Sequence, residues 1–99
     1  MQIICAGKII GGSNDVLLIG REYYFPEHAV DRQYLIKNSS VLHCPDKGYA
    51  TCYDIIVEST TLYNVAWEYL HPYPLAQELK GKIGFSPTLF WVKEITQHE

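Results

Sequence analysis

The five residues from Cys44 to Gly48 place a thiol and an ammonium group three positions apart in one short loop. Pro45 fixes one backbone angle, and Gly48 can adopt angles that other residues avoid, so the loop can be rigid. A rigid loop can hold the Lys47 ammonium toward a carboxylate or phosphate of a ligand. An ammonium beside a thiol also favours the reactive thiolate form. The ordinary alternative is a tight turn with a solvated lysine and a cysteine that packs in the core.

Aromatic residues in other segments could form the walls of a pocket beside this loop. A buried phenol needs a hydrogen-bond partner, so Tyr24, Tyr53 and Tyr69 suit either a ligand site or the core. The alternative is simple cross-strand packing, which we expect for Phe25 and Trp67.

Metal and acid–base chemistry have weaker support. His43 and Cys44 are neighbours on a predicted strand and would point to opposite faces. The chain has no Cys-x-x-Cys pair, so we expect no metal site and no cofactor. Asp46, Asp54 and Glu68 are candidate acid–base groups, but no spacing singles out a pair. No Gly-x-Ser-x-Gly segment or phosphate-binding glycine loop is present in the sequence.

The composition favours one globular domain over the whole chain, 1–99. The chain has 99 residues, of which 47% are hydrophobic and 19% charged. A net charge of −3 with scattered basic residues argues against nucleic acid as a partner. Three cysteines are an odd count, which argues against a disulfide framework. No apolar run is long enough to span a membrane, and the first residues do not resemble a signal peptide, so a cytoplasmic location is expected.

Turn residues divide the chain into many short strands, which predicts a mainly β fold, either a sheet sandwich or an open barrel. The predicted strands cover 2–6, 8–10, 16–19, 22–25, 41–44, 49–58, 63–70, 82–85 and 89–95. Along 49–58, alternation places the odd-numbered residues on one face and the even-numbered residues on the other. Asp31 is expected to cap one helical turn over 31–35, and residues 38–40 are expected to break this turn before the strand at 41–44. Pro74 is expected to begin a short helix near 75–80.

Several motifs, taken in order, resemble one family. They are Tyr24-Phe25-Pro26, Cys44-Pro45-x-Lys47-Gly48-x-Ala50, Ala66-Trp67-x-Tyr69, Pro72-x-Pro74-x-Ala76 and Lys80-Gly81-x-Ile83-x-Phe85. Together they resemble the family catalogued as domain of unknown function 427, and the similarity runs from about Gly7 to Phe85. The resemblance implies a compact, mainly β fold of the kind grouped with Mss4-like β complexes. The family is sometimes labelled nucleotidyltransferase-like.

The resemblance also implies a set of signature positions. They fall on Tyr24, Cys44, Pro45, Lys47, Gly48, Tyr53, Trp67 and Tyr69. This chain departs from the family at Asp46, where an aromatic residue is common, and at Glu68, where tyrosine is frequent. Cys5 replaces a tryptophan often found near the start. Because two carboxylates replace flat rings, a ligand shared across the family would be bound differently here.

Three functions follow from these residues. The leading hypothesis is a small-molecule-binding domain with its pocket around Lys47, and its expected ligand-binding residues are Tyr24, Cys44, Lys47, Gly48, Tyr53, Trp67 and Tyr69. The second is an enzyme that uses Lys47 or Cys44 as the reactive group, assisted by Tyr53 or Asp54. The third is a protein-interaction module, which would include a homodimer formed through an edge strand or through the apolar segment 89–92.

Overall fold

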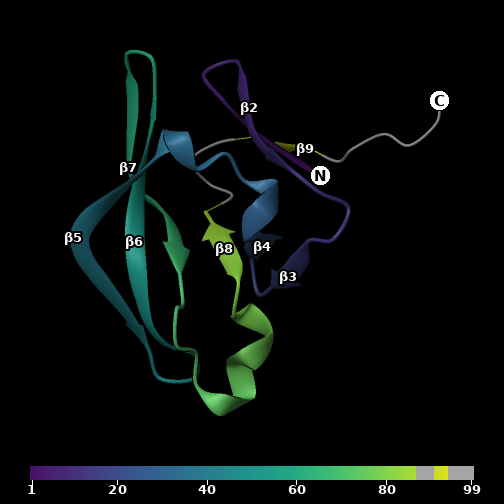
Figure 1. Cartoon of the computed structure of the whole chain (residues 1–99), viewed down its shortest axis with the longest axis vertical. Helices are drawn as coiled ribbons and strands as arrows, with labels where there is room; N and C mark the ends of the chain where they lie inside the picture. Colours follow the sequence, from purple (N-terminus) through teal and green to yellow (C-terminus); the bar gives the residue numbers. More distant parts are fainter. Residues whose placement is uncertain (87–90, 94–99) are drawn as a thin grey trace.

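Two antiparallel β-sheets make up most of the chain (Figure 1). The computed structural model describes residues 1–86 and the backbone of 91–93. The smaller sheet has the order β2 (Lys8–Gly12), β1 (Gln2–Cys5), β9 (Trp91–Lys93). The larger sheet has the order β3 (Leu17–Ile19), β4 (Glu22–Pro26), β8 (Lys82–Phe85), β7 (Thr60–Glu68), β6 (Gly48–Val57), β5 (Leu35–Cys44). The mainly β fold is therefore confirmed, and within the described residues the larger sheet stays open between β3 and β5.

A tight turn lies at Gly7, in the gap between the strands predicted at 2–6 and 8–10. Ala6 and Gly7 both have positive φ, at 49° and 79°, as a two-residue hairpin turn of type I′ requires. The turn joins β1 to β2. Because Ile3, Cys5 and Ile10 are buried, the smaller sheet packs on the main core with its apolar face.

The strand predicted at 41–44 begins earlier than expected, because β5 runs without interruption from Leu35 to Cys44 and includes residues 38–40. Lys37 pairs with Tyr53 of β6, and Val41 pairs with Thr51. Four steps along β5 therefore match two steps along β6, so the residues between Lys37 and Val41 form a bulge.

The carboxylate of one β6 residue forms hydrogen bonds with this bulge and with a second bulge, which lies on β7. The Asp54 Oδ1 atom accepts a hydrogen bond from the Asn38 side chain at 2.8 Å and another from the backbone N–H of Asn64 at 2.9 Å. Asn64 has a φ of 55° and lies where the register between β6 and β7 shifts. Asp54 therefore has a structural role: it accepts a hydrogen bond from a side chain of one bulge and from a backbone N–H of the other.

The larger sheet has a separate apolar cluster on each face. The main core contains Ile3, Cys5, Ile10, Phe25, Val30, Leu35, Ile55, Val57, Val65, Ala66, Ile83 and Phe85. The second, which we call the aromatic cluster, contains Tyr24, Ala50, Trp67, Tyr69, Ala76 and Leu79. Tyr24 and Phe25 are neighbours on β4 and belong to different clusters, as expected for side chains that alternate across a strand.

Among the described residues, three short 3₁₀ helices connect the strands. The helical turn predicted after Asp31 is confirmed as η2 (Arg32–Tyr34), and the Asp31 side chain accepts a hydrogen bond from the backbone N–H of Gln33. η1 (Glu27–Ala29) precedes it. The helix predicted near 75–80 is confirmed as η3 (Pro74–Leu79), which is a 3₁₀ helix and lies at the end of the molecule opposite the smaller sheet (Figure 1). No helix among the described residues is long and apolar enough to cross a membrane.

Candidate functional site

The loop between β5 and β6 forms a closed turn with Lys47 near its end. Cys44 and Gly48 pair as the last and first residues of the two strands. The backbone N–H of Lys47 donates to the Cys44 carbonyl at 3.2 Å. Gly48 has a φ of 112°, which residues with a side chain rarely adopt. The sequence from Cys44 to Gly48 therefore builds a turn that defines the position of the Lys47 backbone.

A second contact fixes the turn from outside. The backbone N–H of Tyr73 donates to the Lys47 carbonyl at 2.9 Å. A Cβ atom on Gly48 would lie 3.4 Å from both the His71 carbonyl and the Tyr73 ring. The segment that leads into η3 is therefore packed directly on the lysine-bearing loop.

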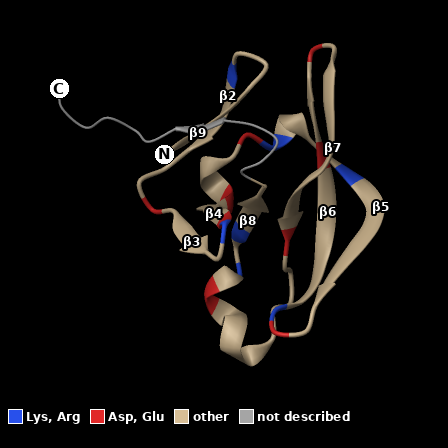
Figure 2. Ribbon diagram, turned by 180° about the vertical axis from the view of Figure 1, so that it is seen from behind, with Lys and Arg blue, Asp and Glu red and all other residues tan. Residues whose placement is uncertain are grey.

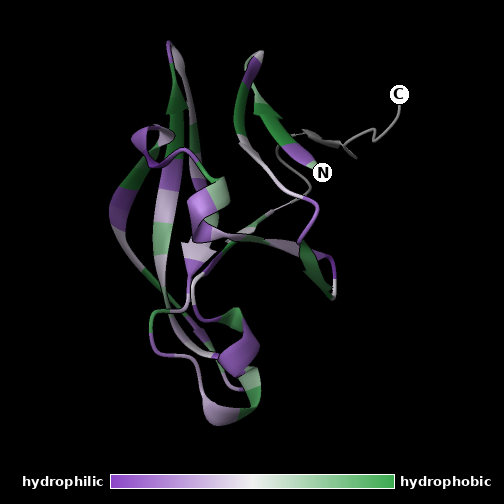
Figure 3. Ribbon diagram, turned by 45° about the vertical axis from the view of Figure 1, so that its right-hand side comes forward, coloured by the Kyte–Doolittle hydropathy of each residue, from purple (hydrophilic) through white to green (hydrophobic). Residues whose placement is uncertain are grey.

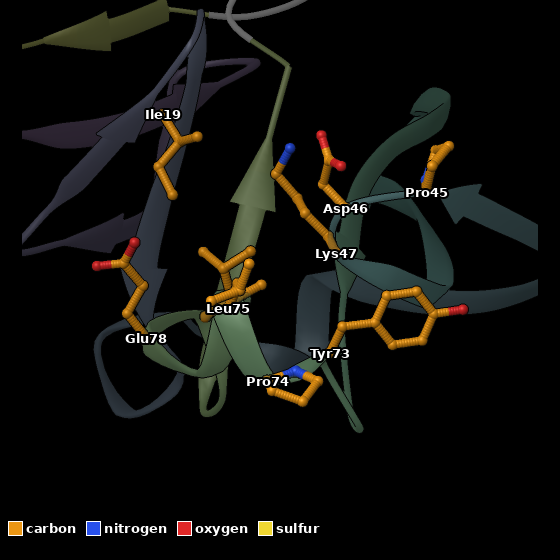
Figure 4. Close-up of a pocket in the computed structure, with 10 residues that line it drawn as sticks. Ile19, Pro45, Asp46, Lys47, Tyr73, Pro74, Leu75 and Glu78 are labelled. Atoms are coloured by element: carbon orange, nitrogen blue, oxygen red, sulfur yellow. The ribbon is translucent and has the colours of Figure 1, made fainter.

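An open groove of about 580 Å³ lies between this loop and η3 (Figure 4). Its lining residues are Ile19, Pro45, Asp46, Lys47, Tyr73, Pro74, Leu75, Ala76, Glu78 and Leu79. One wall is the β5–β6 loop, and the other is formed by η3 with Ile19 of β3. The volume lies within the range of small-molecule sites, which is about 300–1,000 Å³.

The floor of the groove is apolar. Ala76 and Leu79 of η3 are buried members of the aromatic cluster, and Ile19 packs against that cluster from β3. The groove therefore lies over the aromatic cluster, and a ligand in it would contact apolar side chains on its inner side.

The Lys47 side chain extends into the space between its own loop and Ile19 (Figure 4). Its Nζ atom lies 3.8 Å from the Sγ atom of half-buried Cys44. Within residues 1–86, Lys47 belongs to no ion pair. The ammonium is therefore directed at the groove without a carboxylate partner from the described part of the chain.

The aromatic residues expected at the site lie beneath the groove. Trp67 Nε1 donates to the Tyr24 hydroxyl at 3.2 Å, and that hydroxyl donates to Glu22 Oε1 at 2.8 Å. Burial raises the pKa of Tyr24, and it raises the pKa of Tyr69 to about 12, with further contributions from Cys44 and Glu22. None of the three aromatic side chains lines the groove. They form its support, and the packing role expected for Trp67 is confirmed by its burial.

Close packing in this support requires Gly84 on β8. A Cβ atom at position 84 would lie 2.7 Å from Cε2 of Tyr24 and even nearer to the Trp67 ring. The two rings therefore lie directly on the backbone of β8. Phe25, on the other face, is also fully buried, so its expected packing role is confirmed too.

Tyr53 lies outside the groove, although it was expected among the ligand-binding residues. Its side chain packs against the main core, and its hydroxyl donates to Glu68 Oε1 at 3.0 Å. Arg32 Nη2 donates to both oxygens of Glu68 at 3.2 Å and to Glu27 Oε1 at 3.1 Å. Burial raises the pKa of the Tyr53 hydroxyl, which remains neutral beside the Glu68 carboxylate.

This Arg32–Glu68–Tyr53 cluster was missed in the sequence. Glu68 is only 4% exposed, and it is a charged residue in the otherwise apolar run that ends β7. Burial works against the charge on Arg32, but hydrogen bonds and charge from Tyr53 and Glu68 outweigh it and raise the Arg32 pKa. The cluster ties η2 to β6 and β7. A lone carboxylate between apolar residues was the available signal, but its partners lie far away in the sequence.

Other parts of the groove were also missed. Ile19, Leu75 and Glu78 come from β3 and η3, and no spacing connects them with the loop at Lys47. Figure 2 shows charged residues both on the β5–β6 loop and on η3. The groove is therefore formed by segments that only the folded chain brings together.

The described residues offer few groups for metal binding or thiol chemistry. No group of three His, Cys, Asp or Glu side chains there is arranged to hold a metal ion. The three cysteines are free, and Cys5 and Cys52 are buried. Burial raises the pKa of both buried thiols. Cys44 is therefore the most accessible thiol of the three.

These features define a small two-sheet β domain with a lysine-bearing loop beside an open groove. The chain belongs to the family described as domain of unknown function (DUF427), whose sequence model matches residues 1–97. This match confirms the family resemblance of the ordered motifs. No curated protein matches the chain.

Proposed function

We propose that the groove binds a small molecule and that Lys47 anchors an anionic group of that molecule. The observation that carries the proposal is the placement of Lys47: its ammonium faces a groove of about 580 Å³ from a loop that is hydrogen-bonded to its surroundings. The seven ligand-binding residues expected from the sequence thus divide into three kinds. Lys47 lines the groove, five others form its loop or the layer beneath it, and Tyr53 lies elsewhere.

The chemistry of the groove suits a ligand with an apolar part and a charged part. A lysine ammonium forms charge-assisted hydrogen bonds with carboxylate or phosphate, which are stronger than neutral ones. The apolar floor at Ala76 and Leu79 would exclude water from one side of that contact and strengthen it.

A thermal-shift screen of metabolites tests this proposal. A compound present at about ten times its dissociation constant stabilises the folded protein by about 1.4 kcal/mol, which is a shift of several degrees for a domain of this size. We expect at least one compound to stabilise the wild type, to lose that effect in Lys47→Ala and to keep it in Lys37→Ala. Lys37 is an exposed lysine on β5 outside the groove, so it is the matched control.

Two results would overturn the proposal. One is a screen in which no compound stabilises the wild type. The other is a set of stabilising compounds whose effects all persist in Lys47→Ala, because the anchor would then lie elsewhere.

A second candidate function is catalysis, for which the specific observation is the distance of 3.8 Å between Lys47 Nζ and Cys44 Sγ. The assistants expected from the sequence do not support it. Tyr53 is bonded to Glu68, and Asp54 is bonded to the two bulges. Alkylation of the native protein tests the thiol: we expect Cys44 to react well before Cys5 and Cys52. A bound ligand of the groove should slow the reaction, and equal rates at all three cysteines would remove Cys44 as a site.

Self-association through β5 is a further candidate, because β5 is an edge of the larger sheet among the described strands. Val41 is 68% exposed and Leu42 is 40% exposed. Hydrophobic segments flank a hydrophilic stretch along β5 (Figure 3), so pairing between two copies would use the end at Val41–Cys44, beyond the bulge. Light scattering tests this: a dimer that Val41→Lys dissociates supports it, and a monomeric wild type excludes it. The other expected interface, 89–92, lies largely outside the described residues.

A further inference from the structure

Charged side chains of both signs line the groove. Lys47 contributes an ammonium, and Asp46 and Glu78 contribute carboxylates. The ion pairs found in the described part of the chain are Lys8–Glu58, Arg32–Glu27 and Arg32–Glu68, and none of them includes a groove residue. Asp46 and Glu78 also form no side-chain hydrogen bond with any described residue. Three charges therefore face one groove without an ion-pair partner in residues 1–86.

Charged side chains lie on both walls of the groove, and the Lys47 ammonium and the Glu78 carboxylate lie on opposite walls. Lys47 projects from the β5–β6 loop, with Asp46 beside it, whereas Glu78 projects from η3 on the far side (Figure 4). Leu75 lies between them in the same view, and its side chain is 98% exposed. A molecule that reached from Lys47 to Glu78 would therefore cross an apolar surface formed by Leu75 and the floor residues.

The sum of these charges constrains the ligand. One ammonium and two carboxylates give the lining a net charge of −1 at neutral pH. A ligand with several negative charges, such as a nucleoside triphosphate, would gain one favourable contact and meet two repulsive ones. A ligand with a single anionic group and a cationic group at its other end would pair with both walls.

We propose that the ligand of this groove is a linear zwitterion, with a carboxylate held by Lys47, an ammonium or guanidinium group held by Glu78, and an apolar chain between them lying on Leu75. This inference rests on the proposed function, because it specifies the ligand of the same groove. It assigns Glu78 as a specificity residue, which favours molecules that also carry a cationic group over molecules that carry the anionic group alone. Asp46 is near the anionic end and therefore disfavours a second negative charge there.

Three matched probes test the proposal: 6-aminohexanoate has both charged ends, hexanoate has only the anion, and hexylamine has only the cation. Binding is measured by NMR titration of the full chain, for the wild type and for Lys47→Ala and Glu78→Gln. Glu58→Gln is the control, because Glu58 is an exposed acid outside the groove. Thermal unfolding of each variant checks that it is folded.

We expect 6-aminohexanoate to bind about tenfold tighter than either single-ended probe, since each charged contact adds a charge-assisted hydrogen bond. Glu78→Gln should weaken 6-aminohexanoate to the level of hexanoate and leave hexanoate unchanged. Lys47→Ala should weaken it to the level of hexylamine. Glu58→Gln should leave all three affinities as in the wild type.

The failures can be told apart. If hexanoate binds as tightly as 6-aminohexanoate, depends on Lys47 and ignores Glu78→Gln, the zwitterion proposal is overturned and the anion anchor stands. If no probe binds but the metabolite screen finds a Lys47-dependent compound, the zwitterion proposal is overturned and the anion anchor at Lys47 again stands. If neither experiment finds Lys47-dependent binding, both proposals are overturned.

Discussion

The backbone N–H of Tyr73 donates a hydrogen bond of 2.9 Å to the carbonyl of Lys47. This bond joins the two walls of the groove, because Lys47 belongs to the β5–β6 loop and Tyr73 leads into η3. Gly48 makes the close approach possible, since it presents no side chain to the Tyr73 ring. The position of the lysine and the shape of the groove therefore depend on one turn.

Gly48→Ala should destabilise the turn that joins the two walls. The φ of 112° strains any residue with a side chain, and the new Cβ would lie in contact with the Tyr73 ring at 3.4 Å. We expect a loss of about 2–3 kcal/mol in the free energy of unfolding, measured with urea. Gly7→Ala is the matched control, because Gly7 also has positive φ but has open space around it, and it should lose only about 1–2 kcal/mol. Equal losses in the two variants would contradict the greater constraint expected at Gly48.

Tyr24→Phe should destabilise the support beneath the groove. The substitution leaves the buried Trp67 N–H without its acceptor and removes the donor to Glu22. A buried donor left unpaired costs about 1–3 kcal/mol in the free energy of unfolding. Tyr63→Phe, at an exposed tyrosine of β7, should change it by less than about 0.5 kcal/mol. A Tyr24→Phe variant as stable as the wild type would contradict the role of this hydroxyl.

Asp54→Ala should destabilise the fold and leave the groove's chemistry intact. The carboxylate supports bulges on β5 and β7. Its loss leaves the Asn64 N–H without an acceptor and leaves the Asn38 amide with Asn64 Oδ1 alone. We expect a decrease of about 2 kcal/mol in the free energy of unfolding. Asp46→Ala removes an exposed carboxylate and should have almost no effect on stability. Similar stability of both variants would refute the structural role of Asp54.

Stability should fall in strongly alkaline solution. Burial raises the pKa of Tyr69 from its usual value of 10.0 to about 12, and the pKa of Tyr24 also rises. Because the folded state holds these protons more tightly than the unfolded state, the stabilisation is complete below about pH 10 and is lost as the pH rises toward about 12. Urea unfolding across this range measures the loss. Tyr69→Phe should make the decline shallower, and an unchanged slope would show that Tyr69 does not cause it.

Local features of the fold were readable from the sequence, and the long-range ones were not. The turn at Gly7 between the first two strands and the Asp31 cap depend on neighbouring residues, so they were predicted correctly. The continuity of β5 through 38–40 depends on Asp54, which lies on another strand. A run of Asn and Ser with no visible partner therefore indicated a break where the folded chain has a bulge.

The site shows the same division. Lys47 was singled out by its loop, and it does line the groove, but Glu78 and Leu75 enter through the packing of η3 against that loop. Alternation along β6 already placed Tyr53 on the face opposite Ala50, and the two core clusters agree with it. The expectation that Tyr53 joins Tyr24 and Trp67 at one pocket conflicted with that alternation, which was the better guide.

The most direct test of the groove's function is the dissociation constant of a groove ligand, measured by calorimetry in the wild type and in Lys47→Ala. The ligand is the compound with the largest stabilising effect in the thermal-shift screen. If Lys47 anchors its anionic group, the dissociation constant should rise about tenfold or more in Lys47→Ala and stay unchanged in Lys37→Ala. Equal affinity in the wild type and Lys47→Ala would contradict a ligand site centred on Lys47.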